Sequence, residues 1–199
     1  MSASEWHVVS AVALGVCWGS FGLVWVAGAL YNARHAPATR RRSGPSYGWI
    51  VVAFAAWLVV RAVPEGDWGS LTLGATWVRA PGLIVLFAST AFTLWARVVL
   101  GTMWSSSAVA KEGHQLRTDG PYAVTRHPIY TGMVGMLLGS ALLVGLGPWA
   151  VVLALGVVWV EVKLHTEERL LAEEFGGAYE RYRREVPQLV PGLHRRSTH

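Results

Sequence analysis

The sequence predicts an all-α integral membrane protein with about five transmembrane helices, a C-terminal helical hairpin and a cytoplasmic amphipathic extension. Hydrophobic residues make up 53% of the 199 residues and charged residues only 15%, which is too apolar for an ordinary soluble domain of this size. Five apolar segments alternate with short polar ones. The net charge is +5, but the basic residues flank apolar segments instead of alternating with stacking aromatics, so we expect membrane lipids as partners and no nucleic acid.

Each apolar segment has the character of a membrane helix. A helix crosses about 30 Å of hydrocarbon with about 20 residues, and the first four segments reach or nearly reach that length. The fifth is shorter, but it continues into an amphipathic stretch and is expected to emerge from the membrane as one continuous helix. The segments are residues 6–31, 47–63, 81–100, 129–146 and 148 to about 160.

The end of the chain is expected to form a hairpin with an extension. Gly145 to Pro148 reads Gly-Leu-Gly-Pro, a tight turn that predicts a helical hairpin between the last two segments. The amphipathic helix that follows is expected to break at Gly176 and Gly177 and to end at Pro187. We therefore divide the chain into N-terminal membrane helices (1–100), a loop with the hairpin and amphipathic helix (101–191), and a flexible tail (192–199).

The distribution of basic residues predicts the orientation. Segments 32–46, 101–128 and 161–199 carry four, three and seven Lys or Arg, whereas segment 64–80 carries one. The positive-inside rule then places the N-terminus outside and the C-terminus in the cytoplasm. The single cysteine, Cys17, lies inside an apolar segment, so we expect neither a disulfide nor a metal site.

The polar stretch GHQLRTDGPYAVTRHPIYTG, residues 113–132, lies directly between apolar segments. Polar groups at the edge of a bilayer are costly unless they are used or satisfied. Pro128 suits the first turn of the fourth helix and holds His127 in an extended conformation just outside it. Helix N-termini favour a carboxylate or phosphate ligand, so this stretch is the candidate site.

The second half of the candidate site comes from the other arm of the hairpin. Lys163 and Glu167 share a helix face, with His165 and Glu168 adjacent to it. Because the hairpin returns the chain to the side it left, the regions of His127 and Glu167 should meet. Two simpler interpretations stay open: a solvated Lys–Glu pair, and a histidine that only caps its helix.

The stretch 113–132, followed after the hairpin by EERLLAEEFGGAYERYRREVPQLVP, closely resembles the isoprenylcysteine carboxyl methyltransferase family, which is related to the membrane phospholipid methyltransferases. The resemblance covers about residues 90–191. It implies S-adenosylmethionine as the methyl donor and a cytoplasmic active site. It also implies a lipophilic acceptor that arrives from the bilayer, in the first place a carboxylate such as that of an isoprenylcysteine.

The resemblance also implies roles for individual residues. Lys163 and Glu167 are expected to be catalytic, with Lys163 directed at the substrate where relatives carry an arginine. The expected cofactor-binding residues are His114, Gln115, Leu116, Arg117, Tyr122, His127, Pro128, Ile129, Tyr130 and Glu167.

Other functions stay open at this point. No Gly-rich strand-to-helix motif is present, which excludes a soluble Rossmann-type methyltransferase. A phospholipid or other amine N-methyltransferase, an NADPH-dependent membrane reductase of the sterol type, and a noncatalytic scaffold are the alternatives. The His-Pro pair and the short chain argue against the reductase, and neither the acceptor nor the oligomeric state follows from the sequence.

Overall fold

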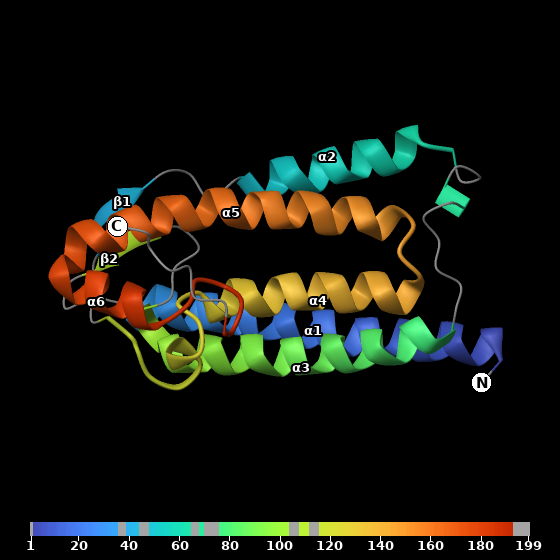
Figure 1. Cartoon of the computed structure of the whole chain (residues 1–199), viewed down its shortest axis with the longest axis horizontal. Coiled ribbons are helices and arrows are strands. Elements are labelled where there is room, and N and C mark those ends of the chain that lie inside the picture. Colours follow the sequence, from blue (N-terminus) through green and yellow to red (C-terminus); the bar gives the residue numbers. More distant parts are fainter. Residues whose placement is uncertain are drawn as a thin grey trace.

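The computed structural model describes residues 2–35, 39–43, 48–64, 68–69, 76–103, 108–111 and 116–192. The described chain is almost entirely helical, as predicted (Figure 1). Its α-helices are α1 (Ala3–His35), α2 (Gly48–Ala62), α3 (Thr76–Leu100), α4 (Pro128–Val144), α5 (Pro148–Phe175) and α6 (Gly177–Glu185). Two 3₁₀ turns, η2 (Gly101–Met103) and η3 (Gly120–Ala123), follow α3 and precede α4.

A short antiparallel ladder was not predicted. Strand β1 (Thr39–Ser43) pairs with β2 (Ala108–Lys111), with Arg42 opposite Val109. The polar sequence of β1 has no alternation of apolar residues, so periodicity gave no signal for it. The ladder ties the connection after α1 to the connection after α3.

Three helices in the described part of the chain are long and apolar enough to cross a membrane: α1, α3 and α5. The apolar parts of α2 and α4 are shorter, Ile50–Ala62 and Pro128–Val144. The structure therefore supports an integral membrane protein, while the count of five spans stays a prediction. Helix α3 begins at Thr76 and contains Pro81, which corrects the expected start of this segment by five residues.

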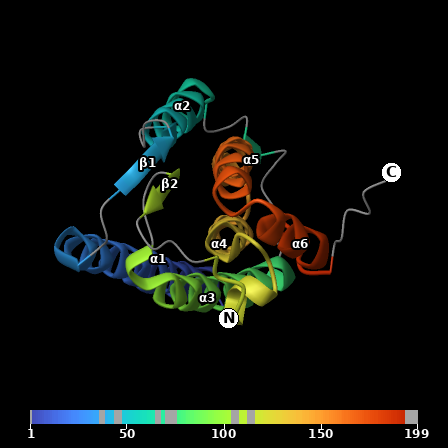
Figure 2. The same ribbon diagram turned by 90° about the vertical axis from the view of Figure 1, so that its left-hand side faces the viewer.

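The helices form two connected groups. α3 packs on both α1 and α4, α1 also contacts α4, and α5 packs on α4 and carries α2 on its other side. Figure 2, which looks along the bundle, shows this order: α1, α3 and α4 together, then α5, then α2. The hairpin turn is as predicted, because α4 ends at Val144, Gly145 adopts a left-handed conformation (φ 103°), and α5 begins at Pro148.

Glycines let α3 and α4 approach each other through their backbones. A Cβ atom on Gly139 would lie 2.5 Å from the backbone nitrogen of Leu86, and one on Gly82 would lie 2.7 Å from that of Leu143. Gly132 and Gly135 meet side chains of α3 in the same way. Small residues at such spacing allow close packing of membrane helices, where burial from water contributes little.

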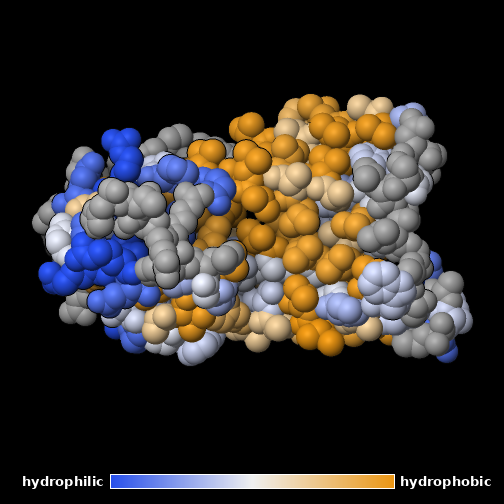
Figure 3. All heavy atoms as spheres, in the orientation of Figure 1, coloured by the Kyte–Doolittle hydropathy of each residue, from blue (hydrophilic) through white to orange (hydrophobic). Residues whose placement is uncertain are grey.

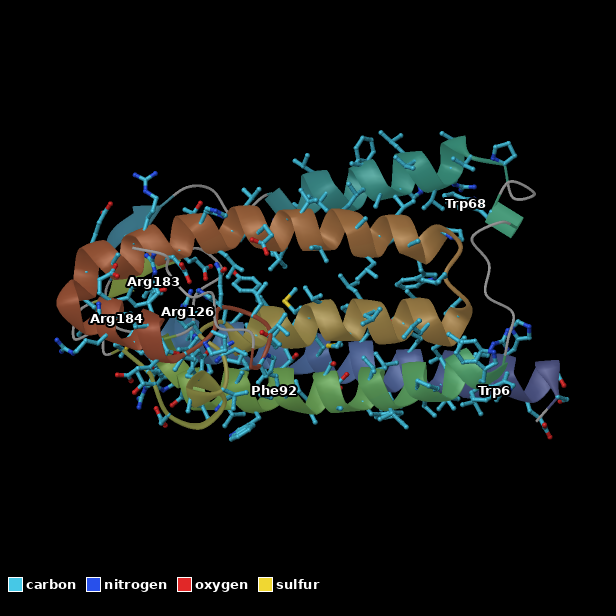
Figure 4. The ribbon with its side chains drawn as sticks, viewed as in Figure 1. Trp6, Trp68, Phe92, Arg126, Arg183 and Arg184 are labelled. Carbon is cyan, nitrogen blue, oxygen red and sulfur yellow. The ribbon has the colours of Figure 1, made fainter. Side chains whose placement is uncertain are left out.

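The two ends of the bundle differ in polarity. Apolar residues cover the middle of the face seen in Figure 3, and hydrophilic residues gather at the end that holds α6. Arg126, Arg183 and Arg184 lie at that end, whereas Trp6 and Trp68 lie at the opposite one (Figure 4). Cys17 is a free thiol buried in the apolar core. Residues 193–199 of the predicted tail lie outside the described residues.

Candidate functional site

The N-terminus of α4 has the local structure predicted for it. Pro128 is the first helical residue, and His127 is the preceding cap residue with φ −125° and ψ 62°, outside the helical region as a following proline requires. The His127 side chain does not cap the helix. Its ring is thus available for other contacts, which removes the interpretation of His127 as a simple cap.

His127 meets α5 at two glutamates. Its Nε2 atom lies 3.3 Å from Oε1 of Glu168 and its Nδ1 atom 3.9 Å from Oε2 of Glu167. Only 5% of the His127 side chain is exposed. The expected meeting of the two arms of the hairpin is therefore confirmed, with both glutamates taking part.

Tyr130, one turn into α4, fixes the second of these carboxylates. Its hydroxyl donates a 2.6 Å hydrogen bond to Oε1 of Glu167, and its ring packs edge-on against Trp159 of α5. Glu167 keeps 21% of its side chain exposed. The carboxylate is thus oriented by protein groups and still reachable by a ligand.

An ion pair between Arg126 and Glu168 at this end was not predicted from the sequence. Arg126 donates from Nε and Nη2 to Oε1 of Glu168, over 3.0 and 2.7 Å, and the two side chains are 8% and 16% exposed. In the sequence, Arg126 directly precedes His127 and Glu168 directly follows Glu167. No sequence spacing, however, relates positions that are 42 residues apart.

Lys163 is half-buried one turn before Glu167. Within the part of the chain that the structure describes, it makes no hydrogen bond or ion pair, and Glu167 bonds Tyr130 instead. The described structure thus shows no ion pair between these two residues. Lys163 is a cation without a protein counter-ion among the described residues, close to an oriented carboxylate.

The remaining predicted residues lie along the chain that enters α4. Tyr122 is buried in η3, and burial raises the pKa of its phenol above the ordinary value. Its backbone carbonyl accepts a 2.6 Å hydrogen bond from the Tyr182 hydroxyl. Pro128 is buried and Ile129 partly buried at the start of α4, and Leu116 is partly buried before η3. His114 and Gln115 lie outside the described residues.

Arg117 carries an unsatisfied donor. Its Nε atom is buried without a hydrogen-bond partner in the described chain, a condition that is costly unless a ligand or water completes it. A buried guanidinium N–H suits a carboxylate such as that of an amino-acid moiety. No cluster of three or more metal-ligating side chains occurs among the described residues.

The fold and this cluster define a helical membrane protein with an ionic site at the N-terminus of α4 and the polar end of α5. The sequence model of the isoprenylcysteine carboxyl methyltransferase (ICMT) family matches residues 82–173, which span α3 to α5 and include most of this cluster. The resemblance seen in the sequence is therefore confirmed.

Individual relatives agree with this match. The protein-S-isoprenylcysteine O-methyltransferase of Schizosaccharomyces pombe is 37% identical over 100 residues, 48% of this chain and 42% of its own. Methanethiol S-methyltransferase 2 of Bradyrhizobium diazoefficiens is 31% identical over 154 residues, 75% of this chain and 51% of its own. The chain thus spans about half the length of these curated relatives.

The fold has a counterpart among solved structures. The eukaryotic intramembrane Ras methyltransferase ICMT, in a structure without a monobody, superposes with a TM-score of 0.58 at 21% identity. The match covers 76% of this chain and 55% of that one. At this identity the similarity concerns the fold.

Proposed function

We propose that the chain is an integral membrane methyltransferase that transfers a methyl group from S-adenosylmethionine to a lipophilic acceptor, in the first place a carboxylate such as that of an isoprenylcysteine. The observation that carries the proposal is the cluster of His127, Tyr130 and Glu167, in which a buried imidazole and an oriented carboxylate meet at 3.9 Å. It lies within the segment that matches the family. Both curated relatives described above are methyltransferases by name.

The donor supplies a methyl group on a positively charged sulfonium. Glu167 would lie near that charge, and its hydrogen bond from Tyr130 keeps the carboxylate in one orientation. Arg117 would bind the carboxylate of the donor, because its buried Nε lacks a partner among described residues. His114, Gln115, Leu116, Tyr122, Pro128 and Ile129 would complete the pocket.

The acceptor is proposed to meet Lys163. A carboxylate is already ionised at neutral pH, so the protein needs to align it and exclude water but needs no strong base. Lys163, without a counter-ion among the described residues, would hold that carboxylate. A lipophilic acceptor reaches this position from the bilayer, and five spans with an outside N-terminus would place the pocket at the cytoplasmic surface.

A thiol acceptor is the second candidate. The methanethiol methyltransferase aligns over 75% of this chain, more than the isoprenylcysteine enzyme does at 48%. A thiol must lose its proton before it attacks, and the His127 and Glu167 pair offers a base for that step. A carboxyl enzyme would not need this base, so at saturating donor the turnover should fall further in His127→Ala with a thiol acceptor than with a carboxylate acceptor.

Donor binding is the first test. Isothermal titration of the purified protein in detergent should give saturable binding of S-adenosylmethionine and none of NADPH. His127→Ala and Glu167→Ala should each lower donor affinity at least about tenfold, the effect of removing a charged or strongly hydrogen-bonded contact. Glu161→Ala, an exposed position on the same helix, is the matched control. Unchanged affinity in both site variants would remove the proposed site.

The acceptor is identified by labelling. Protein in membranes is incubated with methyl-labelled donor and, separately, a farnesylated cysteine with a free carboxylate, a small alkyl thiol, or phosphatidylethanolamine, and products are analysed by mass spectrometry. A base-labile methyl ester indicates carboxyl transfer, a methyl thioether indicates thiol transfer, and a methylated headgroup indicates amine transfer. We expect the methyl ester. Formation of a methyl thioether or a methylated headgroup without any methyl ester would overturn the carboxylate proposal.

A further inference from the structure

The chain beyond α6 returns to the candidate site. We name residues 186–189 the C-terminal strap, since this segment runs across the N-terminus of α4. Each of three groups at the start of α4 donates to a different strap carbonyl. The bonds run from Arg126 N to Pro187 O (2.9 Å), from His127 N to Gln188 O (3.2 Å) and from Thr131 Oγ1 to Leu189 O (2.7 Å).

Arg126 joins the strap to α5 through its side chain. Its Nη1 atom donates to the carbonyls of Arg183 and Val186, over 3.1 and 2.6 Å, while Nε and Nη2 donate to Glu168. The Arg183 carbonyl belongs to the last turn of α6, where unpaired carbonyls and the helix dipole favour a cation. One buried guanidinium thus connects the end of α6, the strap and the carboxylate of Glu168. Figure 4 shows Arg126 at the end of the bundle that also holds Arg183.

These contacts converge on His127 from two sides. Oε1 of Glu168, held by Arg126, lies 3.3 Å from Nε2 of the imidazole, and the backbone N–H of His127 is held by the strap. Thr131 adds a contact to the His127 backbone, because its hydroxyl lies 3.2 Å from the His127 carbonyl as well as 2.7 Å from the Leu189 carbonyl of the strap. The strap therefore holds the backbone of His127 directly, through the Gln188 carbonyl, and its ring only indirectly, through Arg126 and Glu168.

We propose that the C-terminal strap is a positioning element of the methyl-donor site, with Arg126 and Thr131 as positioning residues that act through His127 and Glu168. This inference rests on the proposed function. The strap lies beyond the segment 82–173 that matches the family, and it contributes mainly backbone carbonyls. Displacement of an active group by about 1 Å lowers activity about 100-fold, so loosening the strap weakens donor binding although no donor contact is removed.

Two pairs of variants separate positioning from bulk stability. Arg126→Lys keeps the positive charge, but a single ammonium does not reproduce a fork that reaches Glu168 and the strap together. Arg183→Lys is its control, since the Arg183 side chain is 52% exposed and only its carbonyl touches Arg126. Thr131→Val removes the hydroxyl at nearly constant volume, and Thr131→Ser keeps it.

Arg126→Lys and Thr131→Val should raise the dissociation constant and KM for S-adenosylmethionine about 10- to 100-fold, as loss of supporting contacts does in other sites, with a smaller change in KM for the acceptor. Arg183→Lys and Thr131→Ser should stay within about twofold of the parent protein. If the first two variants lose only thermal stability while the folded fraction binds donor normally, the strap is merely structural and the proposal is overturned.

A second measurement needs no donor and so separates this proposal from the function. Hydrogen exchange of the ligand-free protein in detergent should show protected amides at Arg126 and His127, and faster exchange there in Thr131→Val and Arg126→Lys. Fast exchange in the parent protein, or full protection in both variants, overturns the strap proposal even if donor binding is normal. If the parent protein binds no donor but exchange behaves as expected, the proposed function fails and the strap's hold on His127 stands.

Discussion

Helices α3 and α5 hold α4 in two different ways. Against α3 it packs backbone to backbone, with Gly139 over Leu86 and Gly82 over Leu143. Against α5 its polar contacts lie at its N-terminal end, where Tyr130 and His127 meet Glu167 and Glu168. The α3–α4 contact leaves no space for a larger side chain at these glycines. The α4–α5 contact consists of polar groups that can exchange partners with a ligand.

This difference indicates that the two sides of α4 have different roles. The α3–α4 contact fixes the position of the α4 N-terminus in the bundle, because close-packed backbones do not adjust by small steps. At the α4–α5 contact, the imidazole and phenol at the start of α4 then meet two carboxylates of α5. Loss of the first contact should therefore remove the fold, and loss of the second should alter the site while the fold remains.

The largest effect is expected from Gly139→Ala. The added Cβ would lie 2.5 Å from the Leu86 backbone nitrogen, so the helices must separate, at a cost of about 3 kcal/mol or more for overpacking and roughly a 10 °C fall in thermal midpoint. Gly19→Ala on α1 is the control, since nothing lies within 4 Å of a Cβ there and alanine favours a helix. Equal midpoints for the two variants would contradict the close-packing account.

Glu168→Gln tests the polar side of the comparison. Arg126 and His127 would lose the charge of the oxygen that they share, which should cost about 2 kcal/mol for a largely buried pair whose amide replacement still accepts a hydrogen bond. Thermal unfolding in detergent without donor measures the loss. Glu161→Gln, exposed on α5, should change nothing; a similar loss there would point to a general effect of charge on the helix.

Much of this arrangement was predictable from the sequence because it follows from local patterns. Apolar runs predicted the helices, and the Gly-Leu-Gly-Pro turn predicted the hairpin. The hairpin alone implied that His127 and Glu167 meet, as they do at 3.9 Å. Glycine chemistry also gave the break between α5 and α6, where Gly176 has a φ of 49°.

The missed features depend on contacts that leave no local pattern. The strap bonds α4 through backbone carbonyls, which every residue carries, so no residue type marks Pro187 or Gln188 as partners. The choice of Glu168 for Arg126, and of Tyr130 for Glu167, depends on the rotation of α5 about its axis. Pro81 was expected to begin a helix, but α3 extends back to Thr76 because a membrane helix tolerates proline when neighbours satisfy its backbone.

Tyr130→Phe should have a smaller effect than either change above. It removes one 2.6 Å hydrogen bond to the Glu167 carboxylate while keeping the ring against Trp159. Because Glu167 is proposed to contact the donor, we expect the free energy of donor binding to weaken by about 1.5 kcal/mol, which is roughly tenfold in the dissociation constant. Tyr31→Phe, on an exposed part of α1, is the control. Stronger donor binding in Tyr130→Phe would mean that the phenol competes with the ligand for Glu167.

The contact between α6 and η3 is expected to change the thermal midpoint least near neutral pH and most steeply at high pH. Burial raises the pKa of Tyr182 and of Tyr179 above the ordinary tyrosine value, and the neutral Tyr182 hydroxyl donates to the Tyr122 carbonyl over 2.6 Å. Since the folded pKa lies above the unfolded value of about 10, this stability is complete below about pH 10 and is lost as the pH rises toward the folded pKa.

The thermal midpoint should therefore stay constant from about pH 7 to 9.5 and fall above pH 10. Tyr182→Phe should begin lower, because the bond to Tyr122 is gone, and should fall less steeply, because one ionisation is removed. The glycine contact between α3 and α4 contains no titratable group, so hydrogen exchange should show α6 and the strap opening at alkaline pH before α3 and α4. Simultaneous opening of both regions would mean that α4 depends on its polar end for its place in the bundle.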